Sequence, residues 1–252
     1  MRQEHAIIPL ALAAALGVFA SAPAFAAAPQ AIGVQFVSQG PEAQELSSAL
    51  KIVLVLTFIG LIPGLLVAVT SFTRIIIVLS MLRQALGMQE TPPNMVLTGL
   101  ALFLTLFTML PVAQELNEKA LEPYLSGSIS MQDAVRGAGV PLRDFMVRHT
   151  REQDLSLMVE ISRSPAPATV EDINFVHLVP AFMLSELRTA FQIGFVIFLP
   201  FLLVDLVVSS VLMSMGMLMV PPIVISLPIK ILMFVLVDGW SLVVRSLVGG
   251  FS

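Results

Sequence analysis

Long runs of apolar residues, separated by short polar or proline-containing connections, dominate the chain. Four runs have the length that predicts membrane-spanning helices, because about 17 to 25 apolar residues cross the hydrocarbon core of a bilayer. They cover Ile52–Val69, Met95–Val112, Phe191–Met213 and Val220–Val237. The pattern therefore predicts an all-α, polytopic helical membrane protein built from kinked helical hairpins, with a small helical extracytoplasmic layer between them.

The chain divides into five parts on this pattern. Arg2, an apolar run and the small residues ending at Ala26 predict a cleavable signal peptide, with an uncleaved first membrane helix as the alternative. The Gln-, Ser- and Ala-rich stretch that follows predicts a short mobile segment. The expected parts are a signal peptide (1–26), a mobile segment (27–48), a first helical hairpin (49–113), a polar helical layer (114–175) and a second helical hairpin with a methionine-rich turn (176–252).

Within the first hairpin, Pro63 predicts a kink, because proline removes one backbone donor from a helix. The run after it is flanked by Arg74 and Arg83 and is too short to be a span of its own. It is interpreted as the same helix continuing beyond the membrane or into a protein core. Alternatively, the two arginines anchor a short cytoplasmic loop on the positive-inside rule.

Charged residues concentrate in the region 114–175, which indicates that it faces water. Short helices are expected to begin at Ser130, at Pro141 and at Thr150, each with a first-turn or capping signal. Thr169 is expected to cap the next helix. His149 is expected to belong to a solvated face.

The second hairpin carries charges inside or beside its apolar runs, and such charges are costly in hydrocarbon unless paired. If the turn centres near residues 217 and 218, Asp205 and Lys230 lie about 12 to 14 Å from it on opposite arms, at roughly 1.5 Å per residue. They are expected to pair and to offset each other's desolvation. Glu186 lies too far along the arm to reach Lys230, so it needs a partner on another chain or Arg188.

The turn itself contains Gly216, Pro221 and Pro222, which are typical of a break between helices. Methionines 213, 215, 217 and 219 surround it. Methionine is unbranched and adaptable, so these side chains either pack a buried turn or form an apolar constriction that yields to a passing chain.

Composition narrows the class of function. The 252 residues are 57% hydrophobic and 12% charged, with a mean hydropathy of +0.93, far from an ordinary soluble domain. The net charge of −4 offers no basic surface, so nucleic acid is not an expected partner. There is no cysteine, and no Walker, G-x-S-x-G or H-E-x-x-H motif, so neither an enzyme nor a bound metal or cofactor is expected.

Four stretches resemble the FliP/SctR family of type III export gates. They are SFTRIIIVLSMLRQALGMQETPPN (71–94), PAFMLSELRTAFQIGF (180–195), GMLMVPP (216–222) and PIKILMFVLVDGW (228–240). The likeness runs from about residue 47 to the C-terminus. The ending Val237-Asp238-Gly239-Trp240, together with the leader, is more similar to the flagellar branch.

The resemblance implies a pore-forming structural subunit of the flagellar export gate in the bacterial inner membrane. Its implied partners are other copies of itself, FliQ and FliR, with FlhA, FlhB and the MS ring of the basal body near by, and its cargo is unfolded flagellar export substrates. The family's pore seal corresponds to Met217, Leu218 and Met219, where leucine replaces an expected third methionine.

A second class of function is compatible with the same charges. In a proton-coupled membrane transporter, Asp205, Lys230 and Glu186 would act as relay groups within the membrane.

Overall fold

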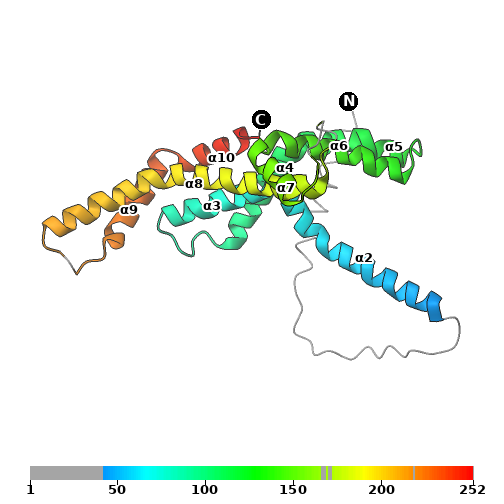
Figure 1. Ribbon diagram of the computed structural model, residues 1–252. Coiled ribbons are helices and arrows are strands. Elements are labelled where there is room, and N and C mark those ends of the chain that lie inside the picture. The colour runs from blue at the N-terminus through cyan, green and yellow to red at the C-terminus, as the bar shows by residue number, and fades with distance from the viewer. Residues whose placement is uncertain (1–41, 166–168, 170–171, 218, 252) are drawn as a thin grey trace. The chain divides into compact units, whose positions relative to one another are not determined.

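The structure, a computed structural model, describes residues 42–165, 169, 172–217 and 219–251. The predicted signal peptide and most of the predicted mobile segment lie outside the described residues. All regular elements in the described part are helical, which confirms the all-α fold class. In chain order they are α2 (Glu42–Val69), α3 (Phe72–Ala85), α4 (Asn94–Leu116), the π-helical turn η1 (Asn117–Leu121), α5 (Glu122–Leu125), α6 (Met131–His149), α7 (Glu152–Ile161), α8 (Phe175–Ser214), α9 (Pro222–Leu236) and α10 (Gly239–Gly249) (Figure 1).

Three helical segments in the described residues are long and apolar enough to cross a membrane: Leu50–Val69, Asn94–Leu125 and Phe175–Ser214. The pair α9 and α10 makes a fourth if both helices belong to one span, which bends by 65° between them. Apolar side chains on these segments are widely exposed. Exposed apolar surface of this extent marks a protein that is covered by lipid or by other subunits.

The chain forms two units, Met1–Leu54 and Val55–Ser252. In the first unit, the described residues form the N-terminal part of α2. All packing discussed below lies within the second unit.

The predicted continuation of the first apolar helix beyond Val69 is not what the structure shows. Helix α2 continues unbroken through Pro63, and it ends at Val69. A new helix, α3, begins at Phe72 after a short break. The expectation of one continuous helix is therefore wrong. The side chain of Ser71, in the break, is fully buried and hydrogen-bonds Thr108 of α4.

Helix α3 is the centre of the larger core. Its fully buried side chains include Ile75, Val78 and Leu79. They follow an i, i+3, i+4 spacing, which places them on one face of a helix. That core also takes side chains from four other helices, namely Leu97, Ala101 and Leu104 of α4, Ala190 and Phe201 of α8, Phe234 of α9, and Val243 and Leu247 of α10.

Helix α8 packs against α3, α6, α7 and α9. Its N-terminal part packs on α6 and α7 around the buried Leu178 and Phe182, its middle lies along α3, and its C-terminal part lies beside α9 (Figure 1). The predicted cap at Ser130 is confirmed, because its hydroxyl accepts a hydrogen bond from the Asp133 amide at 3.2 Å. The predicted helix start at Pro141 is wrong, because α6 continues through it.

The bend between α9 and α10 lies at Asp238 and Gly239. Asp238 adopts a left-handed conformation with φ of 51°, which is uncommon for a residue other than glycine. A Cβ atom at Gly239 would collide with the ring of Phe234. Glycine therefore permits the first residue of α10 to lie against the Phe234 ring of α9 at the 65° bend.

Candidate functional site

The two arms of the C-terminal hairpin are joined by an ion pair. The Lys230 ammonium on α9 donates to Asp205 Oδ2 on α8 at 2.6 Å, so the structure brings these two predicted residues together. The same ammonium donates to the carbonyl of Ala85 at 3.2 Å. Because Ala85 ends α3, its carbonyl has no partner within that helix, and a cation there is favourable. Lys230 thus joins three helices.

Glu186 is paired, but with neither of the partners expected for it. Its carboxylate accepts two hydrogen bonds from the Arg74 guanidinium of α3, one from Nε at 2.7 Å and one from Nη2. Arg188, two residues further along α8, binds Asp154 instead, at 3.4 Å. The expectation of a second chain or of Arg188 as the partner is corrected by this geometry. A forked, two-bond contact to a carboxylate is the strongest ion pair that arginine makes.

The second half of the polar layer is fastened to α8 by a buried network. Asp154 of α7 is almost fully buried and accepts a hydrogen bond from the hydroxyl of Ser185 at 2.7 Å. That hydroxyl accepts in turn from the Arg151 amide at 3.0 Å. The segment Ser185-Glu186-Leu187-Arg188 of α8 therefore binds both α7 and α3.

Sequence reasoning missed the role of Arg74, although a signal was present. Arg74 lies four and eight residues before Val78 and Leu82, which places all three on one stripe of α3. A cation on an otherwise apolar stripe needs a buried carboxylate. The interpretation of Arg74 as a loop anchor does not fit its 4% exposure.

Two backbone hydrogen bonds and a left-handed glycine form the turn between α8 and α9. The Met217 amide bonds the Leu212 carbonyl, and the Gly216 amide bonds the Met213 carbonyl, both at 3.0 Å. This is a Schellman motif, which requires the left-handed conformation that Gly216 adopts at φ of 75°. Pro221 precedes α9, and Pro222 opens it in its first turn.

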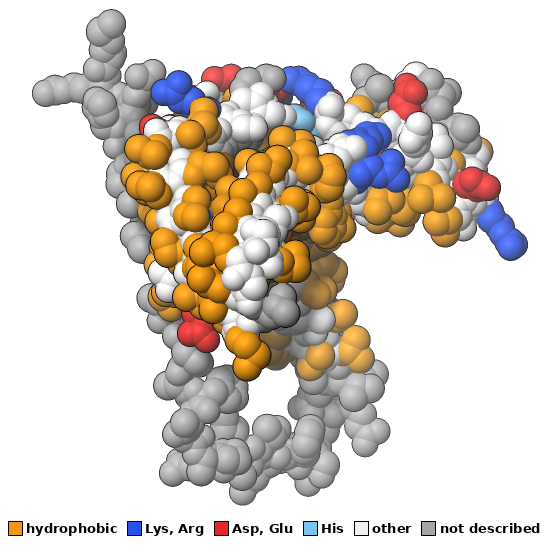
Figure 2. Space-filling view, turned by 90° about the vertical axis from the view of Figure 1, so that its left-hand side faces the viewer, with side chains coloured by type: hydrophobic (Ala, Val, Ile, Leu, Met, Phe, Trp, Pro, Cys, Tyr) orange, Lys and Arg blue, Asp and Glu red, His pale blue; other side chains and the backbone are white. Residues whose placement is uncertain are grey.

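The methionines around this turn are exposed instead of buried. Met215, Met217 and Met219 have exposed fractions of 62%, 42% and 95%, whereas Leu218 lies outside the described residues. Figure 2 shows the molecule from this end, with hydrophobic side chains over most of the face and most charged side chains along its upper edge. The exposures argue against a packed turn within one chain.

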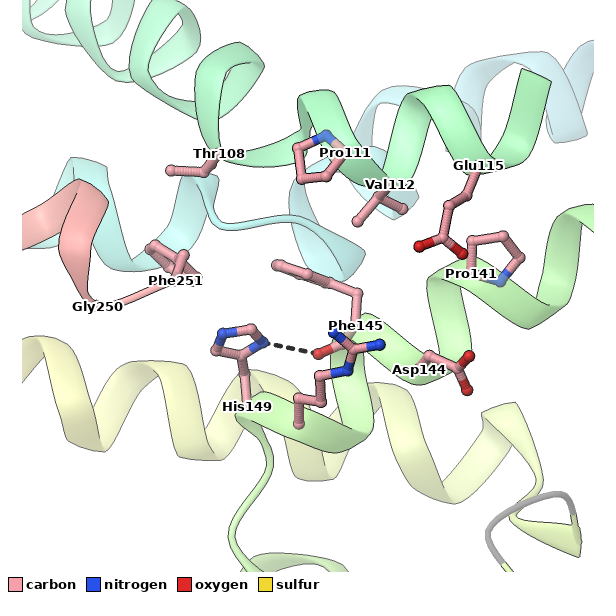
Figure 3. A pocket seen from close by; sticks show the side chains of 11 residues that line it. Thr108, Pro111, Val112, Glu115, Pro141, Asp144, Phe145, His149, Gly250 and Phe251 are labelled. Carbon is pink, nitrogen blue, oxygen red and sulfur yellow. Dashed lines mark hydrogen bonds between the residues drawn. The ribbon is translucent and has the colours of Figure 1, made fainter. Parts of the chain in front are cut away.

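A cavity of about 370 Å³ lies between α4, α6 and the C-terminus. Phe145 and Phe251 form its apolar side, and Glu115, Asp144 and Arg148 also line it. Figure 3 shows the His149 ring at the cavity edge, where Nδ1 hydrogen-bonds the Phe145 carbonyl at 2.8 Å. Burial lowers the pKa of His149 from its ordinary value, and the charges of Arg74 and Arg148 lower it further, against the opposing effect of that carbonyl.

These arrangements hold helices together. Within the described ranges, no three histidine, aspartate or glutamate side chains are arranged to hold a metal ion. The buried carboxylates of Glu186 and Asp154 are both bonded to arginine. Both carboxylates therefore join helices, Glu186 linking α8 to α3 and Asp154 linking α7 to α8.

Comparison with known families decides what kind of protein this is. The FliP family profile matches residues 55–247. The chain belongs to the FliP family. This confirms the resemblance drawn from the sequence motifs.

FliP-family relatives match the chain over nearly its whole length. It is 52% identical over 216 residues to a protein of Bacillus subtilis strain 168, covering 86% of this chain and 97% of the relative. It is 47% identical over 237 residues to one of Pectobacterium carotovorum, covering 94% and 91%. A relative in Caulobacter vibrioides is 43% identical over 250 residues, covering 99% and 92%. Each is named flagellar biosynthetic protein FliP. The four stretches of this chain that resemble the family contain Arg74, Glu186, Lys230 and the methionine turn described above.

Proposed function

We propose that this FliP-family chain is a pore-forming structural subunit of the flagellar type III export gate in the bacterial inner membrane. Several copies assemble with FliQ and FliR, next to FlhA, FlhB and the MS ring, and together they conduct unfolded flagellar substrates. The chain carries out no chemistry of its own. Its polar helical layer, residues 114–175, lies on the outer side of the membrane.

The observation that carries this proposal is the exposure of the apolar methionine side chains at the turn between α8 and α9. Met219 is 95% exposed, so in a single chain its side chain has almost no packing partner. A ring of such turns from several copies would cover these side chains against one another. Because methionine is flexible and polarisable, the ring closes without a substrate and deforms around one. An apolar constriction also excludes water and ions.

The rigid parts of the hairpin support the same role. The Lys230 contacts to Asp205 and Ala85 hold α9 against both α8 and α3. A flexible methionine turn must be carried by helices that do not move. The ion pair fixes the two arms of the hairpin where they pack against each other. The same contacts favour a structural pair over a proton relay, because the ammonium already binds two acceptors within the chain.

The proposal is tested by measuring the permeability of resting cells to a small solute. We expect the double variant Met217→Ala, Met219→Ala to assemble normally and to make cells without export substrates permeable to a small solute. Met131→Ala serves as the matched control, since Met131 is 61% exposed but lies on α6, away from the turn. Complex assembly is measured by the mass of the purified complex, and the leak by solute uptake. If the double variant assembles fully and the permeability is unchanged, these methionines pack the turn and do not seal a pore.

A further inference from the structure

The last described residues of the chain, Gly250 and Phe251, close over the buried arginine of the core. We call these two residues the C-terminal latch. Arg74 Nη1 donates to the Gly250 carbonyl at 3.2 Å, and its guanidinium lies over the Phe251 ring at 3.9 Å from the centroid. The cation–π contact and the hydrogen bond use the face of Arg74 that Glu186 leaves free. A Cβ atom at residue 250 would lie only 3.2 Å from Arg74 Nη1, so a side chain there would crowd the contact.

The opposite side of the latch rests on a histidine. The His149 ring lies 5.2 Å from the Phe251 ring and 4.7 Å from the Phe145 ring, measured between centroids. The Phe251 ring of the latch therefore contacts both the guanidinium of α3 and the imidazole of α6. The cavity in Figure 3 opens beside it and is large enough for water to reach the imidazole once the latch leaves.

The charges around His149 come from four helices, α3, α4, α6 and α8. Two arginines oppose a positive charge on the imidazole, Arg74 of α3 and Arg148 of α6. Arg74 is itself paired with Glu186 of α8. Two carboxylates on the cavity wall, Glu115 of α4 and Asp144 of α6, favour a positive charge on the imidazole.

The two arginines influence His149 more than the two carboxylates do. Glu115 is already bound to Lys119 at 2.9 Å, which reduces its field. Together with burial, the arginines lower the pKa of His149. The latched state thus binds a proton less readily than a state in which His149 meets water.

We propose that protonation of His149 releases the C-terminal latch, which makes the closure of Phe251 over the Arg74–Glu186 pair sensitive to pH. An imidazolium beside Phe251 would place a second cation close to Arg74, and hydration through the cavity would favour the charged ring once Phe251 withdraws. Acidification therefore shifts the population toward the released state, and neutral pH restores the latch. On the outer side of the membrane, this device would respond to the acidity of that compartment.

Hydrogen exchange of the terminal peptide measures the latch directly. The Phe251 amide bonds the Val248 carbonyl at 3.1 Å, so protection of residues 247–251 reports whether the end of α10 stays closed. The purified full-length protein in its assembled complex is exchanged between pH 7.5 and 5.5, and the rates are corrected for the intrinsic pH dependence of exchange. Protection should fall at low pH, by about tenfold for each unit that separates the pKa values of the latched and released histidine.

Three variants distinguish the latch from general acid loosening. His149→Gln keeps a neutral polar side chain and should keep protection constant over the pH range. His177→Gln removes another partly buried histidine, on α8, and should leave the wild-type response intact. Phe251→Leu removes the ring that touches both partners and should give low protection that does not depend on pH.

Either of two results would overturn the proposal: protection in the wild type that does not change with pH, or a pH response that persists in His149→Gln. If His149→Gln fails to accumulate, the Phe251→Leu comparison decides alone, since a persisting pH response there excludes the latch. The assay needs no secretion and no conducting pore, so its outcome is separate from that of the export function.

Discussion

Two of the ion pairs in the described part of the chain, Lys230–Asp205 and Arg74–Glu186, differ in how far the carboxylate is withdrawn from the surface. In the Lys230–Asp205 pair, the lysine side chain is 5% exposed but the aspartate side chain is 45% exposed. In the Arg74–Glu186 pair the values are 5% and 0%. In the first pair the aspartate remains accessible to water or to a neighbouring subunit, and we call it the open pair. In the second both side chains are buried within the chain, and we call it the closed pair. The closed pair is therefore expected to determine whether the subunit folds, and the open pair whether it assembles.

The largest effect is expected from breaking the closed pair. Arg74→Met leaves the Glu186 carboxylate buried without a cation, and such a loss costs about 3–5 kcal/mol of the free energy of unfolding. It also removes the contacts to Gly250 and Phe251. The thermal midpoint of the purified protein should fall sharply, and little protein should accumulate in the membrane.

The double variant Arg74→Met, Glu186→Leu is the control for this effect. It removes the stranded charge together with its partner, and apolar replacements of buried pairs are often well tolerated. We expect it to recover part of the stability that the single variant loses, with the remainder lost through the latch. A double variant no more stable than Arg74→Met would show that burial of the lone carboxylate is not the cause.

A smaller and different effect is expected at the open pair. Lys230→Ala frees the Asp205 carboxylate, which is already half exposed, so the single chain should remain folded with a loss of about 1–3 kcal/mol for the charged hydrogen bond. Because α9 loses its attachment to α8 and to Ala85, assembly of the complex and secretion should decline together. Secretion rate and complex mass are measured on the same cells.

Lys230→Arg is the matched variant for this prediction, since it keeps the positive charge on a long side chain and should retain more assembly than Lys230→Ala. A relay role for Asp205 and Lys230 predicts another pattern. In that case Lys230→Ala would leave a complete complex that has lost its response to the proton gradient. A stable complex that still secretes would argue against a structural role for the pair.

The same contrast explains what the sequence predicts and what it does not. Asp205 and Lys230 are related by a local rule, since equal spacing from a turn places them at one level of a hairpin. Arg74 and Glu186 are separated by 112 positions, and their contact depends on how α3 packs along α8, which no spacing encodes. Glu186 was recognised as needing a partner, because burial of a lone charge is costly, but that argument does not name the partner.

The elements show the same division between local and long-range information. The Ser130 cap follows from a side chain and an amide three residues apart, so it was predictable. The continuation of α6 through Pro141 was not, because Pro141 is buried inside the helix and its surroundings come from residues distant in the sequence. Likewise, the break before α3 depends on the buried contact of Ser71 with Thr108, on a different helix.

The smallest effect is expected where neither partner is buried. Lys119 and Glu115 form an i, i+4 pair at 2.9 Å with side chains 50% and 45% exposed. Exposed pairs contribute little, because water screens both charges in either state and two long side chains must be ordered. Lys119→Ala should therefore leave the thermal midpoint, the assembly and the secretion rate of the protein unchanged within error. A marked loss of assembly would mean that this surface is covered in the complex, and that the exposure of an ion pair in one chain does not determine its importance.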